Sequence, residues 1–279
     1  MGSVNYSTYD LSDKIIEFCD RNSITKEEID RIYQSDSIKN EKLSRINPLV
    51  HQYGIQDASG PEIKDICIKD VVGFEPYNDK RNLCEILSTC YSDGTATYGL
   101  RANDKLQLSK DEMINDIKDS VSFESINLDE VDGKLLVSTN GCHRAAMLKF
   151  LYLDEVLKGE KLPEEINEKY TIKGKVFKYD MTMTYMNYFL QMMKAVSYIK
   201  LDYDDKGLTG KYVIVNDTKT TVSRDEILDL FNKTLEKYPD KVDLDKVNMY
   251  ACIPSFRDFL KEHVLKENEY GNSRNNMWI

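Results

Sequence analysis

The chain has 279 residues, enough to bury a substantial core, and its net charge of −10 argues against a surface built to follow a nucleic-acid backbone. Its six cysteines contain no Cys-x-x-Cys pair and it has three histidines, which argues against a zinc ribbon, a thioredoxin-type dithiol and a His-rich metal centre. No apolar run reaches the roughly 18 residues of a membrane helix and the start lacks the apolar core of a secretory signal, so a cytoplasmic protein without membrane contact is expected.

The N-terminal residues 8–47 are predicted to form short helices. Apolar residues recur on one face from Leu11 to Cys19, and Thr25 followed by Glu28 has the spacing of a capping box at the start of a second helix. Short helices of this kind can resemble a helix-turn-helix. The acidic and polar outer side of this segment favours a packing role over DNA binding.

The middle of the chain is predicted to contain a first strand, a helix and a hairpin. A Gly/Pro/Ser-rich break at 56–61 precedes the strand, which is expected over 63–72. Ser109 and Glu112 form a second capping box that predicts a helix from this point. Asp132-Gly133 predicts a two-residue turn between two strands, the second of which runs through Lys134–Thr139.

Beyond the hairpin the predicted structure becomes more helical. The long apolar stretch from Cys142 to about Leu157 predicts a buried helix. A further strand is expected over 171–177. The Met and Tyr residues of 181–199 recur at helical spacing, which favours core packing over a flexible partner-binding face. Later elements are expected as a small hairpin over 212–222, a helix capped by Ser223 and a last helix from Ser255.

The octet Thr139–Ala146 joins the predicted hairpin to the predicted buried helix. A helix that starts at Gly141 or Cys142 directs backbone N–H groups and the positive end of its dipole outward. Gly141 allows the backbone to approach a ligand closely, and His143 and Arg144 add side-chain donors at the same place. This combination of groups predicts an anion site.

The four residues Gly141-Cys142-His143-Arg144 are similar to the Gly-Cys-His-Arg signature of sulfiredoxins, and the wider pattern resembles the ParB/sulfiredoxin superfamily. Ser109–Ile117 resembles the helix before the central hairpin of that family, and Glu62–Pro76 resembles its first strand and following turn. The superfamily includes CTP-hydrolysing partition proteins, free-serine kinases and ATP-dependent sulfinic acid reductases. The resemblance implies that the motif binds nucleotide phosphates.

The resemblance also implies a fold class and a domain division. The expected class is α+β: a small mixed sheet with helices of the ParB/sulfiredoxin type, extended by an N-terminal helical segment and a C-terminal α/β extension. The expected divisions are 1–61 for the N-terminal segment, 62–180 for the core with an insertion at 77–104, and 181–279 for a mostly helical C-terminal extension.

Nucleotide phosphates are expected to contact Asn140, Gly141, Cys142, His143 and Arg144. Arg144 offers a charge-assisted and bidentate contact, or alternatively a structural ion pair. His143 can donate to a phosphate oxygen or act as an acid or base, and its alternative role is packing. Asn140 either binds ribose or phosphate or orients the turn. Lys110 lies where sulfiredoxins place a nucleotide-contacting lysine, and a solvated lysine is the alternative.

Two further residues carry expectations about chemistry. Cys142, at a helix N-terminus beside His143 and Arg144, is a nucleophile in a sulfiredoxin-like mechanism, or a packing residue beneath a phosphate loop. A phosphotransferase needs a base and usually a magnesium ion near the terminal phosphate. Glu75, just after the first predicted strand, is placed as that base by analogy with the kinases of the superfamily.

Three functions remain open from the sequence. The first is a nucleotide-dependent phosphotransferase or nucleotidase that uses ATP, CTP or another nucleotide with magnesium and an unidentified small-molecule or protein acceptor. The second is a thiol-based reductase that uses Cys142. The third is a ParB-like DNA-binding or regulatory protein, which the net charge disfavours.

Overall fold

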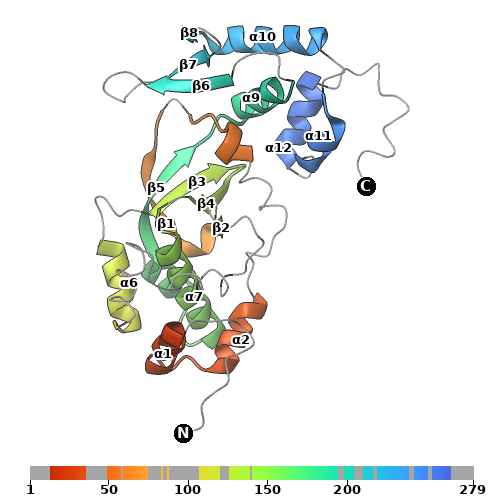
Figure 1. Ribbon diagram of the computed structural model, residues 1–279. Coiled ribbons are helices and arrows are strands. Elements are labelled where there is room, and N and C mark those ends of the chain that lie inside the picture. The colour runs from red at the N-terminus through yellow and green to blue at the C-terminus, as the bar shows by residue number, and fades with distance from the viewer. Residues whose placement is uncertain are drawn as a thin grey trace. The chain divides into compact units, whose positions relative to one another are not determined.

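The computed structural model shows an α+β protein with a five-stranded mixed sheet, a three-stranded sheet and helices (Figure 1). The residues described are 13–35, 49–57, 59–74, 83, 87, 107–119, 126–138, 140–193, 198–203, 210–215, 219–238, 242–250 and 253–264. The chain divides into two units. The first comprises 1–41, 62–129 and 134–176, and the second comprises 42–61, 130–133 and 177–279.

The five-stranded sheet supplies the framework for the motif. Its strand order is β1-β5-β3-β4-β2, with β1 antiparallel to β5 and β2 parallel to β4. The strands are β1 (Glu62–Cys67), β2 (Val71–Phe74), β3 (Ile126–Val131), β4 (Lys134–Val137) and β5 (Thr171–Lys178). The predicted hairpin is confirmed, because β3 and β4 are joined by Asp132 and Gly133 with φ of 51° and 70°, as a type I′ turn requires.

The predicted single strand over 63–72 is wrong. The chain forms β1, then the 3-10 turn η2 (Ile68–Asp70), then β2, and these two strands are the opposite edges of one sheet. Four strand spacings in a flat sheet span about 19 Å. The four residue steps from Cys67 to Val71 reach at most about 14 Å. The sheet therefore curls, and its edges converge where η2 connects them.

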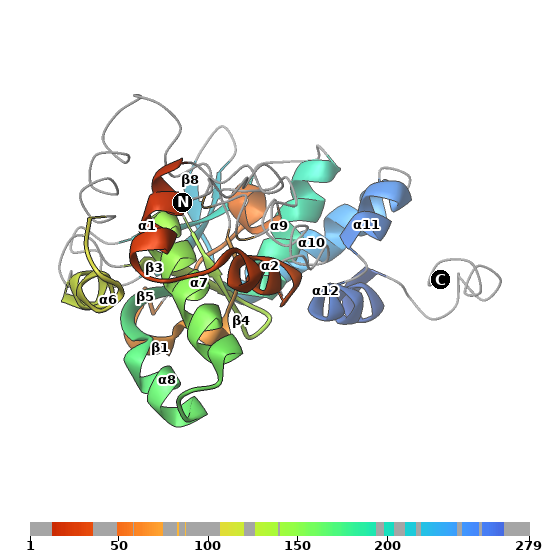
Figure 2. The same ribbon diagram turned by 90° about the horizontal axis from the view of Figure 1, so that it is seen from below.

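Helices of the first unit pack on this sheet and on each other. They are α1 (Asp13–Arg21), α2 (Lys26–Ser35), α6 (Lys110–Asp119), α7 (Cys142–Lys158) and α8 (Pro163–Lys169). Helix α7 contacts α2, α6, α8 and η2, and α2 lies beside it in both views (Figures 1 and 2). The apolar residues of α1 and α2 share one core with those of α7. The structure therefore places 13–35 in a packing role within this unit.

The sequence signals at helix starts are confirmed at three places. The Thr25 and Ser109 boxes form as predicted: Glu28 N–H donates to Thr25 Oγ1 (3.3 Å), and Ser109 N–H donates to Glu112 Oε2 (2.8 Å). Ser223 N–H likewise donates to Glu226 Oε2 (2.6 Å). Helix α8 was not predicted, although its Pro163 at the first helical position is a usual start signal.

The second unit is built around an aromatic core. It contains α9 (Met181–Met192), α10 (Arg224–Lys237), α11 (Leu244–Tyr250), α12 (Pro254–Phe259), the π-helical η4 (Leu260–Val264) and the antiparallel sheet β6 (Tyr198–Tyr203), β7 (Gly210–Val215) and β8 (Lys219–Thr221). Tyr188, Phe189 and Phe256 stack or meet edge-to-face. The predicted packing role of the Met and Tyr stripe is confirmed for α9, but the chain enters β6 before the stripe ends.

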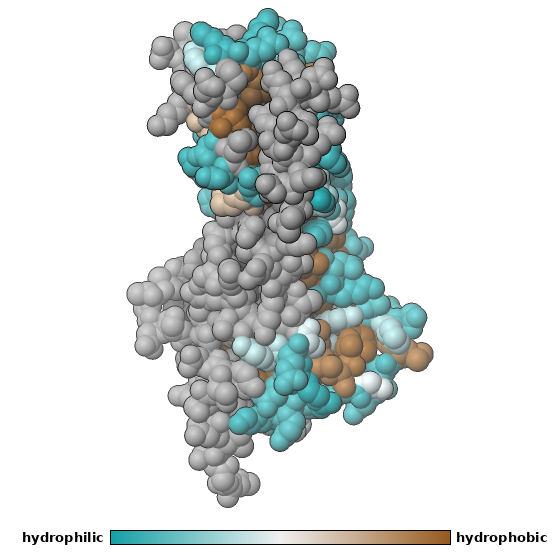
Figure 3. Space-filling model, turned by 90° about the vertical axis from the view of Figure 1, so that its right-hand side faces the viewer, coloured by the Kyte–Doolittle hydropathy of each residue, from teal (hydrophilic) through white to brown (hydrophobic). Residues whose placement is uncertain are grey.

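On the face shown in Figure 3, the described residues form hydrophilic areas with smaller apolar areas between them. Among the described residues, the large apolar side chains that are exposed include Ile63, Leu162 and Met249. Of the helices in the described part of the chain, none is long and apolar enough to cross a membrane.

Candidate functional site

The loop between β4 and α7 is held against the start of β3. Ser138 N–H donates to the carbonyl oxygen of Asn127 (2.8 Å), and Asn127 N–H donates to the carbonyl oxygen of Asn140 (3.1 Å). These two bonds continue the hairpin ladder beyond Val137, so the backbone that enters α7 is ordered by the sheet. Thr139, between them, lies outside the described residues.

Gly141 is the turning point between strand and helix. It is the N-cap of α7 and has φ of 87°, in the left-handed region that favours glycine. A Cβ atom at this position would lie 2.8 Å from Ile126 Cγ1 and 3.0 Å from Ile126 Cα. Both the backbone conformation and the close approach to β3 therefore require glycine here.

Helix α7 begins at Cys142 and presents its positive end to this loop. Ala145 N–H donates to the Gly141 carbonyl (2.8 Å), which closes the first turn around Cys142, His143 and Arg144. That turn contains no acidic residue to offset the dipole. One negative charge at such a terminus gains roughly 0.3 to 1 kcal/mol, and up to about 2 kcal/mol when partly buried.

The thiol of Cys142 points into the protein. Its side chain is buried, and Sγ donates to the carbonyl oxygen of Ser138 (2.8 Å). A nucleophilic cysteine needs an accessible sulfur in an electropositive environment. The position beside a helix terminus fits that requirement, but the burial and the hydrogen bond favour the packing role for this thiol.

His143 and Arg144 are both partly buried at the first turn of α7. Burial lowers the pKa of His143 below its ordinary value of 6.5. The imidazole of the free protein is therefore neutral at neutral pH, with one N–H donor and one acceptor nitrogen. Arg144 remains charged, so the two adjacent side chains offer a cation and a neutral donor.

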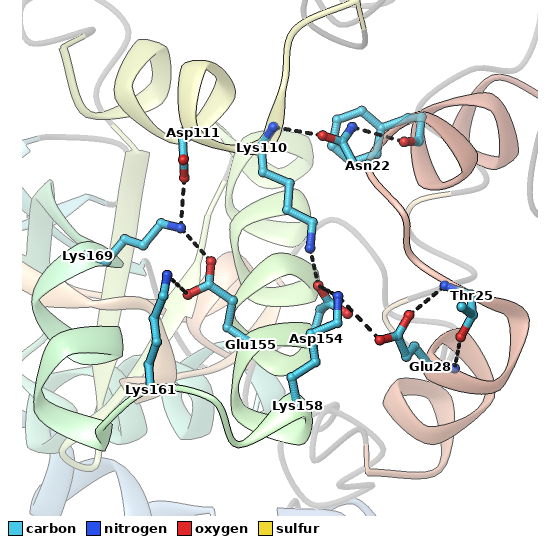
Figure 4. A network of polar contacts seen from close by, with 11 residues as sticks. Asn22, Thr25, Glu28, Lys110, Asp111, Asp154, Glu155, Lys158, Lys161 and Lys169 are labelled. Atoms are coloured by element: carbon cyan, nitrogen blue, oxygen red, sulfur yellow. Dashed lines mark hydrogen bonds and ion pairs between the residues drawn. The ribbon is translucent and has the colours of Figure 1, made fainter.

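The structure does not bring Lys110 to the loop. Its Nζ bonds Asp154 Oδ2, and its backbone N–H donates to Asn22 Oδ1 (3.0 Å) (Figure 4). Asp154 lies twelve positions after Cys142 on α7, which corresponds to about 18 Å along the helix. Glu75 and most of the 77–104 insertion lie outside the described residues. The strand before Glu75 ends at Phe74, which pairs with Val137.

Lys110 belongs to a network of charged side chains at the C-terminal half of α7 (Figure 4). Lys158 Nζ lies 3.1 Å from Asp154 Oδ2 and 3.3 Å from Glu28 Oε1. Burial opposes the charge on Glu28 and Lys158, but hydrogen bonds outweigh it, so the pKa of Glu28 is lowered and that of Lys158 is raised. Both side chains are consequently charged at neutral pH.

Two buried charged residues of α7 were missed by the sequence analysis. Asp154 is fully buried, and Lys149 is 4% exposed. Lys149 Nζ donates to the carbonyl oxygens of Ile68 (3.2 Å), Lys69 (2.9 Å) and Val71 (3.0 Å). The available signal was an isolated charge at an apolar position of a buried helix, which indicates a specific polar partner.

Among the described residues, no group of three or more His, Cys, Asp or Glu side chains is arranged so that it could hold a metal ion. Magnesium in phosphotransferases is commonly held by one or two carboxylates together with the substrate phosphates.

No family model matches the chain, and neither a curated protein nor a solved structure matches it significantly.

Proposed function

We propose that the loop Asn140–Arg144 binds the phosphates of a nucleotide and that the protein is a phosphotransferase or nucleotidase with a ParB/sulfiredoxin-like core. The observation that carries this proposal is Gly141, whose left-handed backbone joins β4 to the N-terminus of α7. A phosphate group needs donors that are oriented before it arrives. A helix terminus followed by a neutral histidine and an arginine supplies them.

The sheet geometry supports a ligand at this edge. Strands β2 and β4 are parallel, and their last residues, Phe74 and Val137, are paired. Strand β4 leads into the proposed phosphate loop, so the end of β2 lies beside the start of that loop. ATP or CTP with magnesium would place its phosphates here, and Glu75, which follows Phe74 in sequence, remains the proposed base. The phosphate acceptor is a small molecule or a protein.

The two alternatives receive less support. A thiol-based reductase requires Cys142 to attack a substrate, whereas its buried Sγ donates to the Ser138 carbonyl. A DNA-binding helix pair requires a basic outer face, whereas α1 and α2 each carry more acidic than basic residues. Neither alternative has an observation that favours it over nucleotide binding.

Arg144→Ala tests the proposal most directly. The wild-type protein is expected to melt at a higher temperature when ATP, ADP, CTP or GTP is added with magnesium. A charge-assisted hydrogen bond contributes about 1.5 to 3 kcal/mol, so the substitution should raise Kd about 10- to 150-fold. Arg224→Ala is the matched control, because Arg224 pairs with Asp180 in the second unit (3.3 Å). Absence of stabilisation by any nucleotide, or an unchanged Kd in Arg144→Ala, contradicts the proposal.

Nucleotide affinity is also expected to rise as the pH falls. The pKa of His143 is depressed in the free protein, and a phosphate beside the imidazole would raise it again. His143 then takes up a proton when the nucleotide binds. The contribution of His143 to the affinity therefore increases as the pH falls through its pKa in the bound protein, and it levels off below its pKa in the free protein. The terminal phosphate titrates near pH 6 as well, so the measurement is the difference between wild type and His143→Gln. In titration calorimetry from about pH 8 to about pH 5.5, the ratio of the wild-type affinity to the His143→Gln affinity should rise as the pH falls. Identical slopes would remove His143 from the site.

A further inference from the structure

Lys149 connects helix α7 to the turn where the two edges of the curled sheet converge. Its buried ammonium binds carbonyl oxygens of Ile68 and Lys69 in η2 and of Val71 at the start of β2. A buried carbonyl needs a donor, and the N–H groups of an ammonium radiate from one atom and can serve several carbonyls together. The same interaction explains why the chain breaks at η2 instead of continuing as one strand.

The connection closes a ring of contacts that includes the proposed phosphate loop. From Val71, strand β2 runs beside β4 and ends with Phe74 opposite Val137. Strand β4 leads through Ser138 and Gly141 into α7, and Lys149 lies seven positions further along that helix, on the same face as Cys142. Lys149 adds three directional hydrogen bonds to the non-directional apolar contacts between α7 and this corner, so its removal weakens the ring at this point.

We infer that Lys149 is a positioning residue, which sets where the N-terminus of α7 and its loop Asn140–Arg144 lie relative to the ends of β2 and β4. The inference deepens the proposed function and rests on it wherever nucleotide affinity is concerned. Lys149 does not touch the ligand. It acts by holding the helix whose first turn binds the phosphates.

The main test compares Lys149→Met with Lys158→Met. Both variants remove one ammonium from α7, but Lys158 bonds Asp154 and Glu28 at the other end of the helix. Both are expected to melt at a lower temperature than the wild type. Only Lys149→Met is expected to raise Kd for ATP with magnesium, about tenfold or more, whereas Lys158→Met should stay within about threefold. A destabilised Lys149→Met with wild-type Kd would show a structural role alone and overturn the inference.

A second readout does not depend on nucleotide. His143 titrates below its ordinary range because it is buried at the loop, and its NMR signal is identified among the three histidines by His143→Gln. In Lys149→Met the titration should move toward the ordinary value, and in Lys158→Met it should not. If the wild type binds no nucleotide, the proposed function fails while this titration still decides the inference. An unshifted His143 in folded Lys149→Met overturns it.

A charge-specific rescue covers the case in which Lys149→Met does not fold. Lys149→Ala leaves space for a small cation beside the three carbonyls. Propylammonium is expected to restore the far-ultraviolet circular dichroism and the melting temperature of this variant, and propanol, which fills the same space without charge, is not. Equal effects of the two compounds, or no effect of either, would contradict a role for the ammonium group.

Discussion

Gly141→Ala is expected to lower the free energy of unfolding by roughly 2 to 5 kcal/mol. The left-handed backbone at φ 87° costs an L-residue about 1 to 2 kcal/mol. The added Cβ would lie 2.8 Å from Ile126 Cγ1 and 3.0 Å from Ile126 Cα, and overpacking of this kind costs about 1 to 3 kcal/mol more. Urea denaturation followed by circular dichroism measures the change. Nucleotide affinity should fall as well, because the loop must move.

Gly159→Ala separates the cost of the left-handed backbone from the cost of the contact with Ile126. Gly159 ends α7 with φ of 65°, but no atom lies within 4 Å of a Cβ built there, so only the backbone cost of about 1 to 2 kcal/mol is expected. In a double-mutant cycle, Ile126→Ala should cost less in the Gly141→Ala background than in the wild type, because it removes the Cγ1 atom that the added Cβ would meet. Equal losses in the two glycine variants would show that the contact with β3 carries no strain.

Local chemistry made much of the fold predictable. The type I′ turn at Asp132-Gly133, the capping boxes at Thr25, Ser109 and Ser223, and the helical run from Cys142 all depend on residues a few positions apart. The prediction of a single strand over 63–72 was wrong because the structure there depends on residues far away in the sequence. Ile68 N–H donates to the Tyr170 carbonyl, and the Ile68 carbonyl accepts from Lys149, 81 positions away. The alternation of apolar and polar residues within a segment does not indicate hydrogen bonds to residues so far away in the sequence.

In the candidate site, too, the features that depend on nearby residues could be predicted and those that depend on distant partners could not. Gly141 was identified by residue type, because a strand-to-helix turn near a ligand favours glycine and the structure gives it a left-handed backbone. The direction of the Cys142 thiol could not be predicted, since it depends on the position of the Ser138 carbonyl. Lys110 was predicted to contact the nucleotide because of its place before the hairpin. Its partner in the structure is Asp154, 44 positions away, and residue spacing along the sequence does not indicate such a pair.

Asp154→Leu is expected to destabilise the protein by about 3 to 5 kcal/mol, because removing one member of a buried ion network leaves the others uncompensated. Asp154 is fully buried, and its Oδ2 accepts from both Lys110 and Lys158. The lysine side chains are 17% and 21% exposed, so their ammonium groups would lose a partner without regaining full hydration. Equilibrium unfolding in urea measures the loss.

Asp111→Asn is the control for the same region. Asp111 pairs with Lys169 at 2.8 Å, but its side chain is 77% exposed, so the loss should not exceed about 1 kcal/mol and should shrink further in high salt. The loss in Asp154→Leu should persist in salt, because the pair is shielded from water. If the two aspartate variants cost the same, the network around Asp154 is hydrated and is not the buried tie between α2, α6 and α7.

The triple variant Lys110→Met, Asp154→Leu, Lys158→Met decides what the network contributes beyond stability. Replacing a buried ion network by apolar residues of similar size often costs much less than removing one partner, since fewer uncompensated charges remain. The triple variant should therefore recover most of the loss seen in Asp154→Leu. Glu28 loses Lys158 but keeps its bond from the Thr25 backbone N–H. Because the proposed phosphate loop lies about 18 Å from Asp154 along α7, nucleotide affinity should remain at the wild-type value. Weakened affinity in a stable triple variant would instead assign Lys110 or Lys158 a part in binding.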